Sequence, residues 1–215
     1  MKVVILCGGK GTRLKEVVPD QPKILAPIHG KPFLYYLLRR LAREGFEDIL
    51  LCTGHGDERI REYLDAEKSL LWGCANLYPS PAPYPDFEIS FSVDHDAGTG
   101  GALKAAELMI GVDRFMVLNG DTWPDIKLGR LLLVHEDYPY RPLVCQCRGV
   151  NAGVYILPKR FTGNIPEGKW DLDAVIEQFS FPYRYQIPGF IDMGTPEGYK
   201  KIKELLDDRQ IKSPA

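Results

Sequence analysis

The stretch that decides the fold is Val3–Leu14, VVILCGGKGTRL, followed shortly by Pro22 and Lys23. Its apolar start predicts a buried strand, and the glycines after it let backbone N–H groups approach an anion. Fixed cations at Arg13 and Lys23 suit a ligand with several anionic oxygens. We therefore interpret this stretch as a loop that handles a triphosphate.

The loop fits neither of the two commonest phosphate-binding glycine patterns. In the dinucleotide pattern G-x-G-x-x-G, Gly9 and Gly11 supply the first pair, but Leu14 takes the third position. The P-loop pattern fails because Lys10 precedes Gly11 and no Gly-Lys-Ser/Thr follows. A dinucleotide oxidoreductase is therefore disfavoured, and an ordinary glycine turn remains the alternative for the glycines taken alone.

Composition favours one domain and excludes some partners. The 215 residues are 45% hydrophobic and 26% charged, which suffices for one substantial core and is short for two full domains. The formal net charge of −2 gives no basic stripe for nucleic acid, so we expect any nucleotide to bind as a small molecule. The strand starts directly after Met1-Lys2 and no run is long enough to span a bilayer, so we expect a cytosolic protein without a membrane partner.

Five cysteines form an odd set, which indicates reduced thiols rather than disulfides. Cys145 and Cys147 share one face of a predicted strand, but a single C-x-C without a second ligand pair is weak evidence for zinc. Free thiols, buried or half-buried, are the favoured interpretation.

Strand-like and helical runs alternate over the first 120 residues. The predicted strands are Val3–Cys7, Asp48–Thr53, Glu88–Val93 and Arg114–Leu118, and the predicted helices are Phe33–Glu44, Asp57–Leu64 and Gly101–Met109. This alternation predicts right-handed βαβ crossovers, and so an α/β fold with a three-layer, Rossmann-like, mostly parallel sheet. Ligands of such sheets collect beyond the carboxyl ends of the strands, so the glycine loop and Asn119-Gly120-Asp121 should face one crevice.

The C-terminal third has fewer helices between its strands. We predict strands at Leu143–Cys147, Asn151–Leu157 and Tyr183–Ile187, and a closing helix over Thr195–Leu206 with proline in its first turn. We expect a single domain over 1–215, with a nucleotide part at 1–122 and a shortened sugar part at 123–215. The proline-rich stretch Asn76–Pro85 is interpreted as an extended surface loop, with a lid or a subunit contact as alternatives.

Six segments, in this order, resemble the sugar-1-phosphate nucleotidyltransferase family: Leu6–Leu14, Pro22-Lys23, Gly98–Ala102, Leu118–Thr122, Val150–Tyr155 and Phe190–Pro196. They span nearly the whole chain. The resemblance implies the nucleotide-diphospho-sugar transferase fold and transfer of a nucleotidyl group from a nucleoside triphosphate to a sugar 1-phosphate, with release of pyrophosphate. Within the family, the chain looks most like the D-glycero-alpha-D-manno-heptose 1-phosphate guanylyltransferase branch, which favours GTP.

Such a reaction presses two anions together, so cations and a metal ion should dominate the site. The forked guanidinium of Arg13 suits the β- and γ-phosphates that leave, and the point charge of Lys23 suits the α-phosphoryl group; the resemblance implies these catalytic roles. Asp121 and Asp192 match the paired Mg²⁺ ligands of the family, and a carboxylate at a strand end suits a hard cation. Ordinary surface charges, for the cations, and helix or turn caps, for the aspartates, are the alternatives.

The resemblance also implies two sets of binding residues. On the nucleotide side these are Leu6, Gly8, Gly9, Gly11, Thr12, Gly98, Thr99 and Gly100; on the sugar side they are Asn119, Gly120, Asn151, Gly153 and Tyr155. Glycines let a base or ribose lie flat on the backbone, and a carboxamide can read sugar hydroxyls. For Tyr155 a plain core position is the alternative.

The sequence departs from the family at one place. In the family, a strand pair carrying a Glu-Lys element usually lies between the Asn-Gly-Asp and Asn-Ala-Gly segments, and its lysine contacts the sugar phosphate. Here only Trp123–Gly149 separates these two segments, and its one strand candidate contains no Glu-Lys. Arg148 is a candidate replacement, and a solvated charge is its alternative. A regulatory subunit that binds a nucleotide sugar without catalysis is therefore a second hypothesis. The complete charge set favours the enzyme, and assembly into a homo-oligomer stays open.

Overall fold

The computed structural model describes residues 1–9, 11–14, 17–19, 21–74, 87–94 and 96–207. The proline-rich stretch Asn76–Pro85 lies outside these residues, so its predicted loop is not tested.

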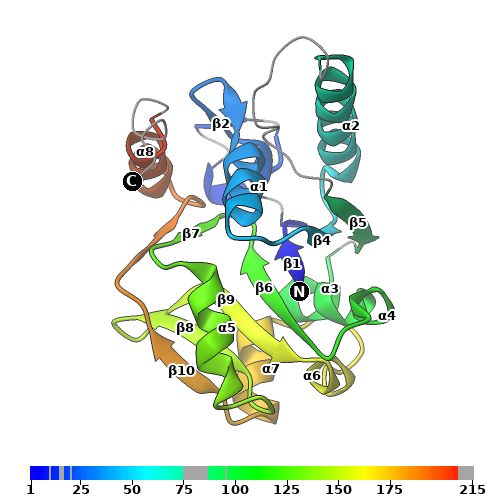
Figure 1. Ribbon diagram of the computed structural model, residues 1–215, viewed down its shortest axis with the longest axis vertical. Coiled ribbons are helices and arrows are strands. Elements are labelled where there is room, and N and C mark those ends of the chain that lie inside the picture. The colour runs from blue at the N-terminus through cyan, green and yellow to red at the C-terminus, as the bar shows by residue number, and fades with distance from the viewer. Residues whose placement is uncertain (10, 15–16, 20, 75–86, 95, 208–215) are drawn as a thin grey trace.

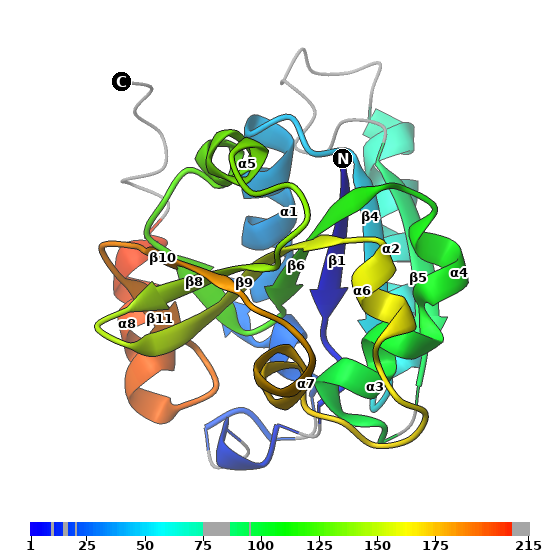
Figure 2. The same cartoon turned by 90° about the horizontal axis from the view of Figure 1, so that it is seen from below.

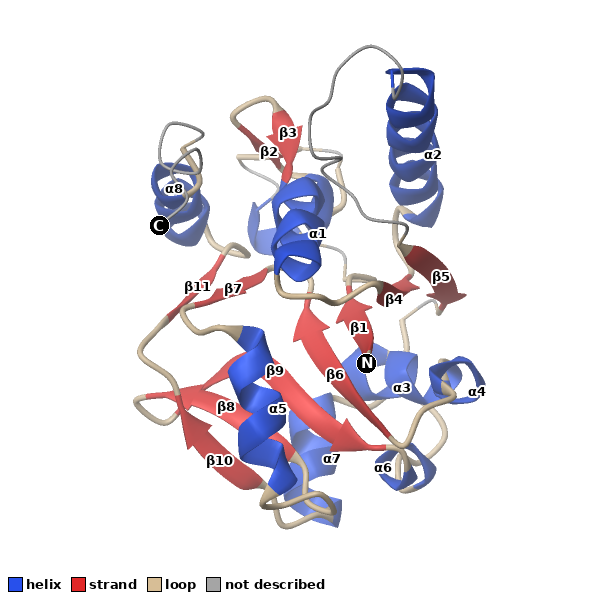
Figure 3. Cartoon of the chain, viewed as in Figure 1, coloured by secondary structure: helices blue, strands red, loops and turns tan. Residues whose placement is uncertain are grey.

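A seven-stranded sheet in the order β10-β8-β9-β6-β1-β4-β5 forms the centre of the molecule (Figures 1 and 3). Its strands are β1 (Lys2–Leu6), β4 (Asp48–Thr53), β5 (Glu88–Val93), β6 (Arg114–Asn119), β8 (Leu143–Cys147), β9 (Val150–Pro158) and β10 (Tyr183–Gln186). Strand β9 runs antiparallel to both of its neighbours, and the other four pairs are parallel. The predicted mostly parallel sheet is therefore confirmed.

Helices cover both faces of the sheet, and each face has its own apolar core (Figure 2). One face carries α1 (Phe33–Arg43), α2 (Asp57–Cys74), α5 (Leu128–Glu136) and α8 (Pro196–Leu205); the other carries α3 (Gly98–Ala105), α4 (Glu107–Ile110), α6 (Arg160–Gly163) and α7 (Leu172–Phe179). In β1, Val3 and Ile5 pack on the first face, whereas Val4 and Leu6 pack on the second. A central strand apolar on both sides is what a three-layer fold requires.

Two short antiparallel ribbons lie outside the main sheet. One joins β2 (Pro27–Ile28) to β3 (Lys31–Pro32), and the other joins β7 (Thr122–Pro124) to β11 (Phe190–Asp192). In the second ribbon Asp192 pairs with Thr122, the residue directly after Asp121. The amide of Met193 also donates to the carbonyl of Asp121 at 2.8 Å. The β7/β11 ribbon thus brings two segments that are 70 residues apart side by side.

Several predicted boundaries were wrong. Helix α2 continues beyond the predicted end at Leu64, and the predicted helix Gly101–Met109 begins earlier and divides into α3 and α4. Helices α5, α6 and α7 and the β7/β11 ribbon were not predicted. Strands β8 and β9 form a hairpin whose two-residue turn, Arg148-Gly149, has positive φ at both positions. Such turns follow the natural twist of the strands and leave no room for an inserted strand pair.

Cys7, Cys52, Cys145 and Cys147 are free, as predicted. No helix in the described ranges is long and apolar enough to cross a membrane.

Candidate active site

A cavity of about 450 Å³ opens at the carboxyl ends of β1, β4 and β6. The predicted site residues that line it are Leu6, Gly8, Gly9, Lys23, Gly98, Thr99, Asn119, Gly120 and Asp121. The predicted crevice and these nine lining positions therefore coincide. Of the other predicted residues, Arg13 and Asp192 lie beside Lys23 and Asp121, whereas Gly100, Asn151, Gly153 and Tyr155 do not line the cavity.

Glycine is needed where the strand ends converge. The amide of Gly120 donates to the carbonyl of Leu6 at 2.8 Å, and a Cβ atom on Gly120 would lie 2.9 Å from that same oxygen. A Cβ atom on Gly8 would lie 3.2 Å from the backbone of Thr53 and Gly54. Side chains at these two positions would force the strand ends apart, so the glycines fix the shape of the cavity floor.

Two cation–carboxylate pairs stand at the edge of the cavity. Lys23 Nζ lies 2.9 Å from Asp121 Oδ2, and both side chains are about one-fifth exposed. Arg13 Nη2 lies 3.8 Å from Asp192 Oδ2, and this guanidinium is 64% exposed. The two pairs meet at Gly194, because a Cβ atom there would lie 2.8 Å from Asp192 Oδ1, 2.9 Å from Lys23 Nζ and 3.1 Å from Asp121 Oδ2. The two aspartates and the lysine therefore converge on one small space that only a glycine leaves open.

The two carboxylates fit a hard divalent cation. Mg²⁺ is commonly held by one or two carboxylates, with phosphates and water completing its shell. Around Gly194, oxygens of Asp121 and Asp192 face the same point, which a Cβ would fill. Among the described residues there is no cluster of three or more His, Cys, Asp or Glu side chains that could hold a metal by itself. The donor set thus suits a metal that arrives with a phosphate ligand.

Asp192 also has the turn role that the sequence left open. Its Oδ1 accepts the amide of Gly194 at 2.7 Å, and Thr195 caps α8 by accepting the amide of Gly198. These hydrogen bonds hold the carboxylate in place while Oδ2 remains directed at Arg13. The local turn and the ionic contact are compatible in one side chain.

Two thiols line the inner part of the cavity. Burial raises the pKa of Cys7, and it raises the pKa of Cys52 to about 12. The Cys7 thiol donates to the carbonyl of Cys52 at 3.3 Å. Both are therefore neutral at pH 7 and contribute an apolar wall rather than a nucleophile.

A part-buried polar network joins residues predicted for the sugar side, and it includes a residue that the sequence analysis missed. Asp173 Oδ1 accepts from Tyr155 Oη at 2.8 Å and from Asn151 Nδ2 at 2.5 Å. The side-chain oxygen Oδ1 of Asn151 accepts the amide of Gly153 at 2.8 Å. Burial raises the pKa of Asp173, and burial next to Asp173 raises the pKa of Tyr155. The network therefore holds the β9 backbone and the N-terminus of α7 in a fixed relation.

The glycines at the start of α3 allow it to pack closely against the backbone of Trp170. The amide of Gly100 donates to the carbonyl of Trp170 at 2.8 Å, and a Cβ atom on Gly98 would lie 2.4 Å from that oxygen. Thr99 Oγ1 accepts the amide of Leu172 at 2.8 Å. Gly98 and Thr99 still line the cavity, but Gly100 faces the segment that precedes α7. The glycines thus admit another part of this chain as well as any ligand.

Two lining residues, Asp96 and Lys169, were not predicted because they are far apart in the sequence. Lys169 Nζ lies 3.0 Å from Asp96 Oδ1, which links the loops before α3 and α7 at the cavity mouth. Asn119, whose Oδ1 is buried without a partner among the described residues, packs against Gly153. The positive φ of Gly153 and the 2.5 Å between its virtual Cβ and Asn119 Nδ2 show why glycine stands there.

The sequence profile described as Nucleotidyl transferase matches residues 2–147. The chain belongs to the nucleotidyl transferase family. The D-glycero-alpha-D-manno-heptose 1-phosphate guanylyltransferase of Campylobacter jejuni is 36% identical, covering 97% of this chain and 92% of the relative. The enzyme of that name from Aneurinibacillus thermoaerophilus is 26% identical, covering 96% of this chain and 98% of the relative.

Solved structures agree with this family membership. HddC from Yersinia pseudotuberculosis superposes with a TM-score of 0.76 at 27% identity, covering 96% of this chain and 99% of the other. HddC complexed with GMP-PN gives a TM-score of 0.71 at 26% identity, with the same coverage. UDP-glucose pyrophosphorylase from Acinetobacter baumannii, at 18% identity and a TM-score of 0.76, shares the fold. The predicted nucleotide-diphospho-sugar transferase fold is therefore confirmed.

Proposed function

We propose that this nucleotidyltransferase transfers the guanylyl group of GTP to a heptose 1-phosphate, giving a GDP-sugar and pyrophosphate. The observation that carries the proposal is the convergence of Lys23, Asp121 and Asp192 on the space at Gly194, at the edge of a nucleotide-sized cavity. The identity of both substrates is drawn from the named relatives. The charges of this chain supply the chemistry common to any such pair.

In the absence of a nucleotide, each of the two cations forms an ion pair with an aspartate. Each cation is paired with one carboxylate, so the four side chains are together close to neutral. A triphosphate brings several negative charges, so Arg13 turns to the β- and γ-phosphates while Lys23 contacts the α-phosphoryl group. The donors then stabilise the charge that develops as pyrophosphate leaves.

Asp121 and Asp192 are the residues that would hold Mg²⁺ in this proposal. When bound, the ion would neutralise phosphate oxygens and help to align the two phosphoesters. The two carboxylates accept this role once Lys23 and Arg13 are engaged by phosphate. The amide of Gly194 keeps Asp192 oriented during the exchange.

The acceptor is expected to lie between β9 and α7. Asn151, Gly153 and Asp173 form a hydrogen-bonded surface beside Asn119 and offer carbonyl and carboxylate acceptors to sugar hydroxyls. The turn residue Arg148 is exposed at the end of the β8/β9 hairpin and stays a candidate for the phosphate of the acceptor. The C. jejuni alignment extends over 238 positions, more than the 215 residues of this chain, so the relative has residues without a counterpart here.

A substrate matrix tests the proposal. GTP, ATP, CTP, UTP and dTTP are each combined with heptose, mannose and glucose 1-phosphates, with and without Mg²⁺, and pyrophosphate is measured. We expect the fastest release with GTP and the heptose phosphate, and none without the metal. Absence of pyrophosphate in every combination would favour the regulatory subunit, and a preference for another nucleotide would overturn the guanylyl assignment.

A further inference from the structure

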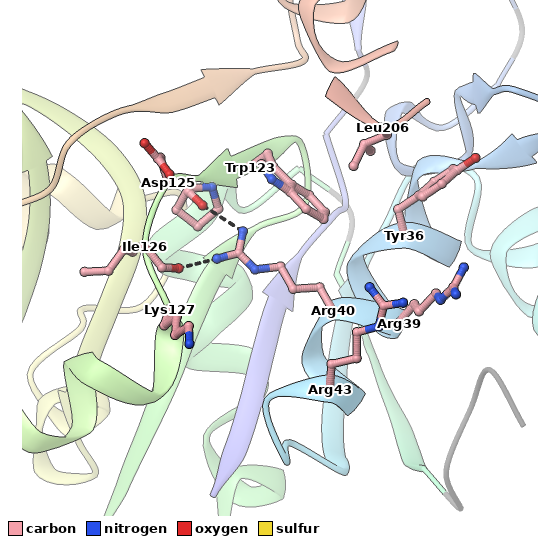
Figure 4. Close-up of a pocket in the computed structure, with 10 residues that line it drawn as sticks. Tyr36, Arg39, Arg40, Arg43, Trp123, Asp125, Ile126, Lys127 and Leu206 are labelled. Carbon is pink, nitrogen blue, oxygen red and sulfur yellow. Dashed lines mark hydrogen bonds between the residues drawn. The ribbon is translucent and has the colours of Figure 1, made fainter. Parts of the chain in front are cut away.

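A second cavity, of about 340 Å³, lies between α1 and the segment that follows β7 (Figure 4). None of the residues that line it lines the catalytic cavity. Four of them are cations, Arg39, Arg40, Arg43 and Lys127, and one, Asp125, is an acid. This charge is unexplained by the proposed reaction.

One of these cations has a structural role. Arg40 Nη1 donates to the carbonyl of Pro124 at 2.7 Å, Nη2 donates to the carbonyl of Ile126, and Nε contacts Glu44 at 3.1 Å. Its guanidinium also lies 4.8 Å from the centre of the Trp123 ring. Arg40 therefore holds the wall of the cavity in place, and each of its three guanidinium nitrogens already has a partner within the protein.

The other three cations have no carboxylate within ion-pair distance in the described part of the chain. Arg39 makes a long contact, 3.5 Å from Nη1 to Tyr35 Oη. Arg43 and Lys127 are exposed. Arg39 and Arg43 follow Tyr36 on one face of α1, and Lys127 stands across the cavity at the start of α5. Unpaired guanidinium groups on one rigid helix repel one another unless an anion lies between them.

We propose that this cavity is a second binding site, which takes a phosphorylated small molecule. Arg39 and Arg43 offer forked donors matched to phosphate oxygens, and Lys127 offers a point charge from the opposite wall. Half-buried Trp123 supplies an apolar surface for the organic part of the ligand. The compact cavity and the net charge of −2 favour a small molecule over nucleic acid, which needs an extended basic surface.

The site borders the ribbon that carries a catalytic aspartate. Trp123 pairs with Ile191 in the β7/β11 ribbon, next to the pair formed by Thr122 and Asp192. A ligand against Trp123 would therefore touch the segment that directly follows Asp121, while remaining outside the catalytic cavity.

Equilibrium dialysis of the full chain with labelled GDP, glucose 1-phosphate or inorganic phosphate tests the proposal. We expect Arg39→Gln/Arg43→Gln to bind one equivalent fewer than the wild type for at least one probe. Loss with all three probes would identify phosphate as the recognised group, and loss with GDP alone would identify a nucleotide. The control Lys200→Gln/Lys201→Gln removes two exposed charges from α8 and should bind as the wild type does.

The proposal is overturned if the double variant binds every probe in the same amount as the wild type, or if the α8 control loses the same equivalent. Thermal unfolding reports whether the variant is folded. Should the double variant lose its thermal transition, Arg43→Gln alone, at an exposed position, must show at least a fivefold weaker affinity for the second equivalent. Whether the wild type releases pyrophosphate is measured separately and does not bear on this difference in stoichiometry.

Discussion

The proposed nucleotide half of the crevice and its proposed acceptor half are built in different ways. The nucleotide half consists of strand ends, glycine backbone and partly exposed charges, in which Lys23 and Arg13 pair with the aspartates at one end of the β7/β11 ribbon. The acceptor half consists of buried Tyr155 and the half-buried side chains of Asn151 and Asp173, already joined by hydrogen bonds. The first half can exchange its internal partners for a ligand, whereas the second is largely organised before a ligand arrives. We therefore expect changes in the first half to affect turnover and changes in the second to affect acceptor affinity.

The largest effect is expected at the aspartates of the nucleotide half. Asp121→Asn and Asp192→Asn should each lower kcat by about 10³-fold, because the amide removes a charge that holds the metal and aligns the phosphates. Pyrophosphate release under saturating substrates measures this, and thermal unfolding checks the fold. Asp137→Asn, at the exposed residue directly after α5, is the matched control. Turnover within threefold of the wild type in either variant would remove the metal role.

Arg13→Ala is expected to come next, with kcat lower by about 10²-fold, or about 3 kcal/mol of transition-state stabilisation. The guanidinium is largely exposed, so the folding free energy should change little. Comparing kcat with KM for GTP distinguishes transition-state stabilisation from ground-state binding, because a contact made only in the transition state lowers kcat. A change confined to KM would assign Arg13 to ground-state binding.

Gly194→Ala tests the shared space between the two pairs. The new methyl group would lie 2.8 Å from Asp192 Oδ1 and 2.9 Å from Lys23 Nζ, so these side-chain ends must move. We expect about a 30-fold loss of kcat and a higher Mg²⁺ concentration for half-maximal rate. Gly129→Ala, where a Cβ meets nothing within 4 Å, is the control. Unchanged metal dependence would mean that the carboxylates do not act at this point.

Asp173→Asn is expected to give the smallest effect, and that effect should be on KM rather than on kcat. KM for the sugar phosphate should rise about tenfold with kcat nearly unchanged, since one charged acceptor is lost from a preformed surface. The raised pKa of Asp173 has a second consequence, because the folded state holds this proton more tightly than the unfolded state. Relative to Asp173→Asn, the unfolding free energy of the wild type should therefore fall as pH rises from about 3.9 through the raised pKa.

Chemical denaturation at several pH values measures that difference. A difference between the two proteins that does not vary with pH would contradict the burial of the ionised carboxyl. A loss of kcat equal to that of the aspartate variants would erase the contrast between the two halves.

The sequence predicts the nucleotide half well because its signals are local. The apolar run of β1, the glycines after it and the alternation of strands and helices determine that the loops converge at one sheet edge. The positions of Leu6, Gly8 and Lys23 on the cavity follow from that edge. That Asp121 and Asp192 lie close together could be predicted only from the family resemblance. The strand pairing that joins residues 122 and 192 leaves no periodic pattern in the sequence.

The acceptor half is less predictable because its contacts join residues that are distant in the sequence. Asp173 has no neighbouring motif, and its role depends on contacts with Asn151 and Tyr155 across about 20 residues. The glycines at the start of α3 were interpreted as a ligand surface, but their close contact with Trp170 is a tertiary requirement that the motif does not reveal. The extension of α2 and the break between α3 and α4 likewise depend on packing rather than on periodicity.

The central claim is that Asp121 and Asp192 gather a divalent ion beside the phosphates of a bound nucleotide. The most direct measurement is anomalous scattering from crystals grown with Mn²⁺ and a non-hydrolysable GTP analogue. The account predicts one strong peak within about 2.5 Å of a carboxylate oxygen of each aspartate, with the phosphates next to Arg13 and Lys23. An analogue bound in the cavity with no peak between the aspartates, or with its phosphates directed away from both cations, would contradict the account.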